Sequence, residues 1–184
     1  MIKKFIAKNT KKYGKGNFAT KDIKKGEVVF VLGGKRFDVS EFANKVNSGK
    51  EYIDDPFQIG RRTYIDLNET SRTFNHSCNP SCGIRKNSEL FALRDIKKGE
   101  ELTYDYSLTI APTDWKMKCK CGAANCRKIL GDVSSITKQR RSEYSKMGAI
   151  QTYMKKLLKL IDIGKYTIPS YEQKALIQLS KANS

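Results

Sequence analysis

Short runs of β-branched and aromatic residues, separated by glycine-containing turns, occupy the first two thirds of the chain. Residues 27–32 and 90–93 are such runs, and Gly, Asp and Lys bound them. Runs of this length and composition predict short strands. One short helix is predicted among them over residues 40–46, with Ser40 as its N-terminal cap.

The hexapeptide Asp-Ile-Lys-Lys-Gly-Glu occurs at residues 22–27 and again at residues 95–100, each time before a β-prone run. A single repetition is too little for a solenoid. We expect two similar turns, with Gly26 and Gly99 where the backbone needs a positive φ.

Apolar residues recur at three- and four-residue steps after residue 130. This pattern predicts one or two amphipathic helices that pack on the core, broken near Gly148 and ended by Gly164. The apolar stripe consists of Ile136, Tyr144, Met147, Ile150, Met154, Leu157, Leu158 and Ile161. Alternatively, such a stripe could contact a partner protein or a membrane surface.

A last helix is predicted over residues 169–179. Pro169 would open it, and Ser170 and Gln173 have the spacing of a capping box. The C-terminal helices could pack on the domain, recognise substrate or form a dimer contact, so the expected state is a monomer or a homodimer through these helices.

The length of 184 residues and the hydrophobic content of 39% suffice for one compact domain with an appendage. No stretch approaches the roughly 18 continuous apolar residues of a membrane span. The first ten residues lack the apolar region of a signal peptide. We therefore expect an intracellular protein with no membrane partner.

A formal net charge of +17, from 36 Lys and Arg against 19 Asp and Glu, gives a surface that attracts polyanions. Non-specific association with nucleic acid or chromatin at low salt is expected. The simpler interpretation is a solvated basic surface, because the lysines are spread along the whole chain.

Three thiols fall within eight residues, at Cys119, Cys121 and Cys126. One glycine-containing turn can direct all three at a single ion, and a structural zinc site needs four ligands. The remaining soft candidates for the fourth ligand are Cys78, Cys82 and His76.

Two further segments contain polar groups that could take part in chemistry. The single histidine, His76, could be a ligand, a base or a hydrogen-bonded turn residue, and a nucleophilic pair of Cys78 with His76 is a further alternative. Residues 101–106 form a strand-like run in which Tyr104 and Tyr106 share a face by the two-residue period of a strand.

Taken in this order, four motifs closely resemble the SET-domain protein-lysine methyltransferases with a post-SET zinc segment. The motifs are a Gly-Lys-Gly turn at residues 14–16 and the segments 72–80, 101–106 and 119–126. The resemblance covers residues 8 to about 130. It implies a mainly β fold of several small curled sheets, with a knot-like threaded active site, plus a helical C-terminal extension. The expected division is residues 1–113 for the SET domain, 114–131 for the post-SET zinc segment and 132–184 for the extension.

The resemblance also implies an activity and its cofactors. A methyl group would pass from S-adenosyl-L-methionine to the ε-amine of a lysine in a protein substrate, a histone or another lysine-rich protein. Tyr106 and Tyr104 are the implied catalytic residues, and a tyrosine at position 104 favours mono- or dimethylation. The implied cofactor-binding residues are Lys15, Gly16, Asn17, Asn75, His76, Tyr106 and Leu130, with Ile129 beside the last. The implied ligands of one structural zinc ion are Cys78, Cys119, Cys121 and Cys126.

The sequence departs from the family pattern at two positions. Val31 stands where a tyrosine is common, and Ser81 stands where an asparagine usually follows the histidine motif. The alternatives are a catalytically silent zinc module that binds chromatin or nucleic acid, and a cysteine hydrolase that uses Cys78 and His76. The expected location is the cytoplasm or nucleus, or a host nucleus for a microbial or viral protein.

Overall fold

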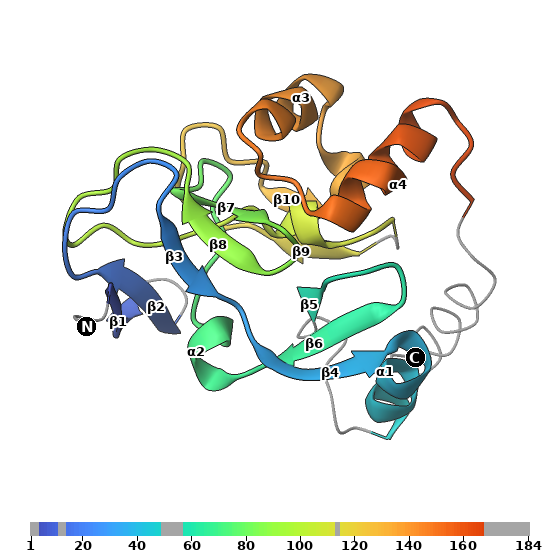
Figure 1. Ribbon diagram of the computed structural model, residues 1–184, viewed down its shortest axis with the longest axis horizontal. Coiled ribbons are helices and arrows are strands. Elements are labelled where there is room, and N and C mark those ends of the chain that lie inside the picture. Colours follow the sequence, from blue (N-terminus) through green and yellow to red (C-terminus); the bar gives the residue numbers. More distant parts are fainter. Residues whose placement is uncertain (1–3, 11–13, 49–56, 113–114, 168–184) are drawn as a thin grey trace.

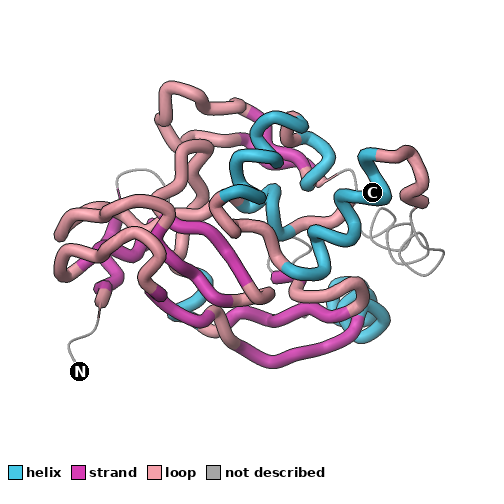
Figure 2. The backbone as a smooth tube through the Cα atoms, turned by 45° about the horizontal axis from the view of Figure 1, so that its top comes forward, coloured by secondary structure: helices cyan, strands magenta, loops and turns pink. Residues whose placement is uncertain are grey.

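The computed structural model describes residues 4–10, 14–48, 57–112 and 115–167, which form several small antiparallel sheets rather than one large sheet (Figures 1 and 2). The strands are β1 (Phe5–Thr10), β2 (Gly14–Ala19), β3 (Val28–Val31), β4 (Gly34–Asp38), β5 (Phe57–Gln58), β6 (Thr63–Leu67), β7 (Cys82–Arg85), β8 (Glu89–Ala92), β9 (Lys116–Lys118) and β10 (Ile129–Gly131). The helices are α1 (Val39–Asn47), α2 (Glu69–Arg72), η1 (Tyr106–Thr109), η2 (Val133–Ser135), α3 (Lys138–Lys146) and α4 (Thr152–Asp162), of which η1 and η2 are 3₁₀-helices.

The described strands pair in four sheets. Strands β1 and β2 form a hairpin, β3, β8 and β7 form one three-stranded sheet in that order, β4, β6 and β5 form another, and β9 pairs with β10. The strands predicted near residues 27–32 and 90–93 are β3 and β8, which are neighbours in one sheet. The predicted fold class, mainly β with helices at the C-terminal end, is confirmed.

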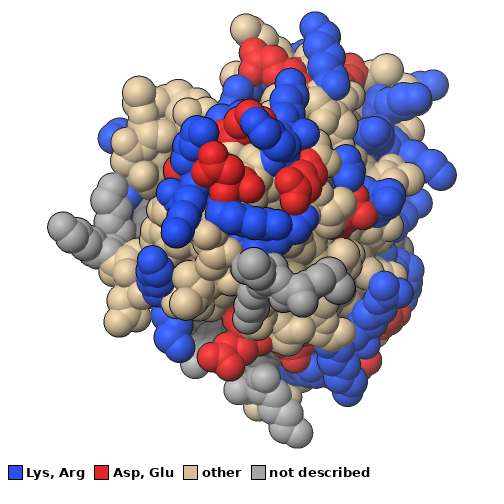
Figure 3. Space-filling view, turned by 60° about the vertical axis from the view of Figure 1, so that its left-hand side comes forward, with Lys and Arg blue, Asp and Glu red and all other residues tan. Residues whose placement is uncertain are grey.

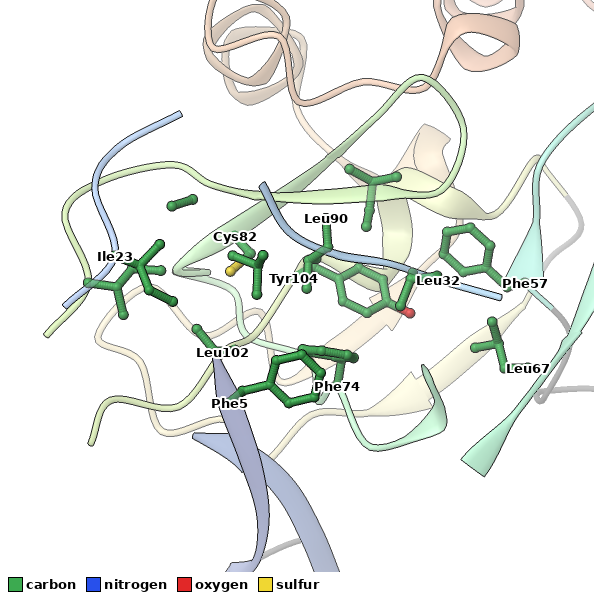
Figure 4. Close-up of a cluster of buried hydrophobic side chains, with 14 of the residues drawn as sticks. Phe5, Ile23, Leu32, Phe57, Leu67, Phe74, Cys82, Leu90, Leu102 and Tyr104 are labelled. Carbon is green, nitrogen blue, oxygen red and sulfur yellow. The ribbon is translucent and has the colours of Figure 1, made fainter. Parts of the chain in front are cut away.

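Buried apolar side chains between these sheets form the main core (Figure 4). Phe5, Phe30 and Phe74 make mutual ring contacts with centroids 5.0 to 5.6 Å apart. Leu102 and Tyr104 are buried in the same cluster, although they belong to no regular strand. The core thereby fixes the backbone of the segment that contains the predicted catalytic tyrosines.

The repeated hexapeptides pair with each other through reciprocal hydrogen bonds. Ile23 and Ile96 exchange backbone hydrogen bonds of 2.9 Å in both directions. Each aspartate accepts bonds from two consecutive lysines of the other turn: Asp22 from Lys97 and Lys98, and Asp95 from Lys24 and Lys25. Gly26 and Gly99 have φ of 82° and 89°, as predicted. The charges on this side of the molecule are of both signs and interleaved (Figure 3).

Two predictions of local structure are wrong in detail. Helix α1 begins at Val39, and the Asp38 side chain rather than Ser40 caps it, because Asp38 Oδ1 accepts the backbone N–H groups of Ser40 and Glu41. The run 101–106 forms no regular strand; Glu101 and Tyr104 make isolated bridges to different segments, and η1 begins at Tyr106.

Helices α3 and α4 pack against β8 and η1 through a second buried cluster, and they lie together above β7 and β8 in Figure 1. The cluster joins Phe91, Leu93 and Leu108 to the predicted stripe, including Tyr144, Ile150 and Met154. Gly148 and Gly164 have positive φ and follow α3 and α4, as predicted. The helix predicted over residues 169–179 lies outside the described residues. Among the described helices, none has the length and apolarity to cross a membrane.

Candidate functional site

The segment around His76 lies beside the segment around Tyr104, and the two run parallel. His76 and Tyr104 form a parallel bridge, in which Tyr104 N–H donates to Asn75 O at 3.1 Å and Ser77 N–H donates to Tyr104 O at 3.2 Å. Residues 75–77 and 104–106 are far apart in sequence. This bridge therefore brings the predicted catalytic and cofactor-binding residues together.

Tyr104 and Tyr106 lie on the same side of this junction, with ring centroids 4.8 Å apart. The Tyr106 hydroxyl donates to Phe74 O at 2.9 Å, which fixes the orientation of its ring. Tyr104 is buried, and burial raises the pKa of its phenol well above the usual value. Tyr104 is thus a neutral hydroxyl at physiological pH.

Asn75 connects the glycine turn that opens β2 to the tyrosine segment. Its Nδ2 donates to Lys15 O at 3.1 Å and to Glu101 Oε1 at 2.8 Å. Gly16 lies directly at this contact, because a Cβ there would be 2.4 Å from Glu101 Oε1 and 2.8 Å from Asn75 Nδ2. Asn17 is buried beside it, and its Oδ1 has no hydrogen-bond partner in the described structure.

A cavity of about 480 Å³ lies between the β1–β2 hairpin, the histidine segment and the cysteine segment. This volume is within the range of small-molecule and cofactor sites. Its lining includes Thr10, Phe18, His76, Ser77, Glu101 and Cys121. Arg94 also lines it, so the cavity offers an aromatic ring, hydroxyl groups and charges of both signs. Of the residues expected to bind the cofactor, His76 belongs to this lining, and the others lie outside it.

Two other residues expected at the cofactor have different environments. Leu130 is fully buried and packs with Cys78 and Cys119. Its neighbour Ile129 is 61% exposed. Leu130 therefore supports the cysteine segment from inside, and Ile129 presents an apolar side chain to solvent.

Four potential metal ligands converge beside the cavity. The ligand atoms of His76, Cys78, Cys119 and Cys121 all lie within 4.8 Å of one another, and the Sγ atoms of Cys78 and Cys119 are 3.9 Å apart. The thiol of Cys126 packs in the same cluster, with its Sγ 3.9 Å from Cys119 O. Strands β9 and β10 hold the ends of the cysteine segment together.

The hydrogen bonds of His76 assign its tautomer. The Tyr106 backbone N–H donates to His76 Nδ1 at 3.3 Å, which favours the neutral tautomer with its proton on Nε2. Nε2 is 3.3 Å from Cys78 Sγ, to which it can donate. Burial lowers the pKa of His76 to about 4, which keeps the ring neutral. In this arrangement His76 supports the Cys78 sulfur and would have to lose its Nε2 proton before it could bind a cation.

The thiols differ in how readily they ionise. Burial raises the pKa of Cys78 and of Cys119. Burial also opposes ionisation of Cys121, but backbone hydrogen bonds and the neighbouring thiols outweigh it and lower its pKa to about 7. A divalent cation such as Zn²⁺ would ionise all of the clustered thiols, because thiolate is the binding form. Soft sulfur donors at this spacing fit zinc.

The geometry does not suit a cysteine hydrolase. Cys78 is buried, and burial raises the pKa of its thiol, which opposes formation of a nucleophilic thiolate. Cys82, the remaining cysteine, is fully buried in the main core, where burial raises its pKa to about 12. Neither thiol has the low pKa and exposure of a nucleophile.

The sequence interpretation missed three residues behind the site. Asp105 is 3% exposed, and it accepts hydrogen bonds from Arg127 and from Tyr144. A charged residue between two tyrosines, and an arginine directly after the last cysteine, were the only local signals for this contact.

Comparisons with known proteins agree with the motifs. A sequence profile of the SET domain matches residues 14–107. The chain is 35% identical over 130 residues to histone-lysine N-methyltransferase 2B of Homo sapiens, which covers 64% of this chain and 5% of that protein. It is 34% identical over 143 residues to histone-lysine N-methyltransferase ASHH3 of Arabidopsis thaliana, covering 71% of this chain and 39% of that protein. The chain thus spans less than half the length of these relatives.

Proposed function

The chain belongs to the SET-domain family, and from this membership we propose that it is a protein-lysine methyltransferase that uses S-adenosyl-L-methionine. The observation that supports the proposal most directly is the parallel bridge between His76 and Tyr104. It brings Tyr106 next to the histidine segment that lines a cofactor-sized cavity.

The bound cofactor would supply a methyl group already activated on a sulfonium, so the protein needs mainly to orient the reactants and exclude water. Lys15, Gly16, Asn17, Asn75 and His76 would bind it, His76 through its main chain. Tyr106, oriented by its bond to Phe74 O, would present its phenol beside the reacting atoms.

The substrate lysine must lose its proton before it can attack. Its ordinary pKa is about 10.4, and a narrow apolar channel that removes water favours the neutral amine. Tyr104 and Tyr106 would form part of the wall of that channel. The hydroxyl of Tyr104 would limit the space there, so we propose mono- or dimethylation.

One structural zinc ion would be held by Cys78, Cys119, Cys121 and Cys126, a set of four soft thiolate donors. The ligand atoms of the first three converge with that of His76, and Cys126 packs against the same cluster. The ion would cross-link the histidine segment to the post-SET segment and so form one wall of the cavity. A histone or another lysine-rich protein is the proposed substrate, which would place the protein in a nucleus or in the cytoplasm.

The test is calorimetric titration of S-adenosyl-L-methionine into zinc-loaded protein, together with transfer of radiolabelled methyl groups to histones and to whole-cell extract. We expect binding, and labelling that Tyr106→Phe lowers at least about a hundredfold. Tyr64→Phe, a hydroxyl deletion in β6 whose ring packs on Phe37 and Phe42, is the matched control and should retain activity. Folded, zinc-loaded protein that does not bind the cofactor would instead support a silent chromatin- or nucleic-acid-binding module.

A further inference from the structure

The buried carboxylate of Asp105 joins three parts of the molecule that are separate in sequence. Its Oδ1 accepts hydrogen bonds from Arg127 at 2.5 Å and from the backbone N–H of Ser107 at 3.2 Å. Its Oδ2 accepts from the Tyr144 hydroxyl at 3.2 Å. Because an ionised carboxylate is buried only where hydrogen-bond donors satisfy it, these donors fix where Asp105 lies.

Asp105 in turn fixes the start of η1, whose first residue is Tyr106. It is the N-terminal cap of η1 through the bond from Ser107 N–H. The Tyr106 backbone N–H bonds to His76, and its hydroxyl bonds to Phe74. A displacement of Asp105 therefore moves the backbone of the proposed catalytic tyrosine.

Arg127 carries this contact to the cysteine segment. It follows Cys126 directly, and its backbone N–H donates to Cys78 Sγ at 3.4 Å. Its guanidinium is partly buried against Asp105. Removal of a donor to Asp105 would thus loosen both the tyrosine segment and the thiol cluster.

Tyr144 contributes from α3, beyond the residues that match the SET-domain profile. It is 0% exposed, and its ring lies among Phe91, Leu108 and Met154 and under the guanidinium of Arg140, 4.6 Å from the ring centroid. Burial and the neighbouring charge of Asp105 raise the pKa of Tyr144, so the phenol keeps the proton that it donates.

We propose that Tyr144 is a positioning residue for the methyl-transfer site: through Asp105 it holds both Tyr106 and the zinc-binding segment in place. The C-terminal helices then complete the active site from behind instead of only covering the core. This inference rests on the proposed function, because methyl transfer is the reaction for which Tyr144 would hold the other residues in place.

The test compares Tyr144→Phe, which removes one hydroxyl, with Leu158→Ala, which loosens the packing of α4 but leaves the bond to Asp105 intact. Both proteins are assayed zinc-loaded, well below their melting temperatures. The readouts are the rate of zinc release to a coloured chelator, kcat, and KM for the cofactor and for a histone substrate.

We expect Tyr144→Phe to lower kcat about tenfold and to speed zinc release by a similar factor, since a hydrogen bond to a buried charge is lost. Leu158→Ala should stay within about twofold of the parent in both, although it melts earlier. Unchanged kcat and zinc release in Tyr144→Phe would overturn the proposal. Equal changes of kcat and zinc release in Tyr144→Phe and Leu158→Ala would also overturn the proposal, because a general loss of packing would affect both variants alike.

If Tyr144→Phe does not fold, Arg127→Lys is used in its place. This variant keeps the positive charge at position 127 but loses the planar guanidinium that donates to Asp105. Faster zinc release would support the coupling, and an unchanged rate would overturn it. A parent protein without methyl transfer would refute the proposed function alone, because zinc release still measures whether Tyr144 acts on the cysteine segment.

Discussion

At the scale of single residues, Gly16 is a position where the structure leaves no space for a side chain. A Cβ there would collide with Glu101 Oε1 at 2.4 Å and with Asn75 Nδ2 at 2.8 Å. The bond between Asn75 and Glu101 would have to shift, and with it the turn proposed to bind the cofactor.

We therefore predict that Gly16→Ala weakens cofactor binding about tenfold or more, equivalent to roughly 1.4 kcal/mol, measured by calorimetric titration. Gly33→Ala is the control, because the nearest atom to a Cβ at that position is 3.7 Å away. Equal affinity of Gly16→Ala and the parent protein would show that the turn does not contact the cofactor.

Tyr104 is the residue at which the product of the reaction should be decided. Its ring is 4.8 Å from that of Tyr106, and it is buried in the main core. Under the proposed function, loss of its hydroxyl would leave space for one further methyl group on the substrate amine.

We predict that Tyr104→Phe keeps activity within about tenfold of the parent and shifts products towards di- and trimethyllysine, as measured by mass spectrometry of a histone peptide. Tyr106→Phe should lose activity without such a shift. A parent protein that already trimethylates would contradict the proposed product state.

At the scale of elements, β7 meets the connection between α3 and α4 at Gly83. A Cβ at Gly83 would lie 2.6 Å from Ala149 Cβ and 2.9 Å from Leu93 Cδ2. This glycine therefore allows the C-terminal helices to approach the sheet closely.

Gly83→Ala should destabilise the protein by about 1–3 kcal/mol, the usual cost of overpacking a core, as measured by urea denaturation. Gly60→Ala, whose nearest contact would be 3.5 Å away, is the control. A Gly83→Ala protein as stable as the parent would mean that the helices dock less tightly than described.

The two paired turns make the free energy of unfolding depend on pH in the acidic range. Hydrogen bonds from lysine side chains and backbone N–H groups lower the pKa values of Asp22 and Asp95 below 3.8. A carboxylate whose pKa is lower in the folded state stabilises that state above its unfolded pKa, and the contribution disappears as pH falls through the folded pKa.

We predict that the double variant Asp22→Asn with Asp95→Asn has a lower urea midpoint than the parent at pH 7. The difference should shrink as the pH falls below about 4, because the parent carboxylates are then protonated as well. Glu69→Gln, an exposed carboxylate away from these turns, should change little at either pH. A pH-independent difference would point to packing instead of charge.

At the scale of the whole molecule, the net charge of +17 should produce salt-dependent association with nucleic acid. On the face shown in Figure 3, acidic side chains lie among the basic ones, which argues against one sequence-reading surface there. The attraction is therefore expected to be general and directed at phosphates.

Binding of a fluorescent DNA duplex, followed by anisotropy, should weaken at least tenfold between about 50 and 200 mM salt. Two duplexes of unrelated sequence should bind equally. Affinity that resists salt, or that differs strongly between the duplexes, would contradict a general electrostatic attraction.

The local features of this fold were largely predictable. The strands near residues 28–31 and 89–92, the glycine turns and the two C-terminal helices follow from periodicity and from glycine at positive φ, which are properties of neighbouring residues. The predicted cap of α1 was two residues too late, because Asp and Ser are both favoured as caps. In the structure the Asp38 carboxylate accepts the first backbone N–H groups of the helix. The strand expected over residues 101–106 does not form, because this segment makes single bridges to two different segments and has no one strand to pair with along its length.

The sequence by itself determined the family, because the order of its motifs, with the tyrosine pair and the cysteines, is specific to it. Only the tertiary structure decided how they are connected. The imidazole of His76 accepts a hydrogen bond from a backbone donor 30 residues away, and the Asp105 carboxylate accepts one from Tyr144, 39 residues away. Such buried polar contacts leave no periodic trace in the chain, because each is a single pair whose partners meet only when the core has packed.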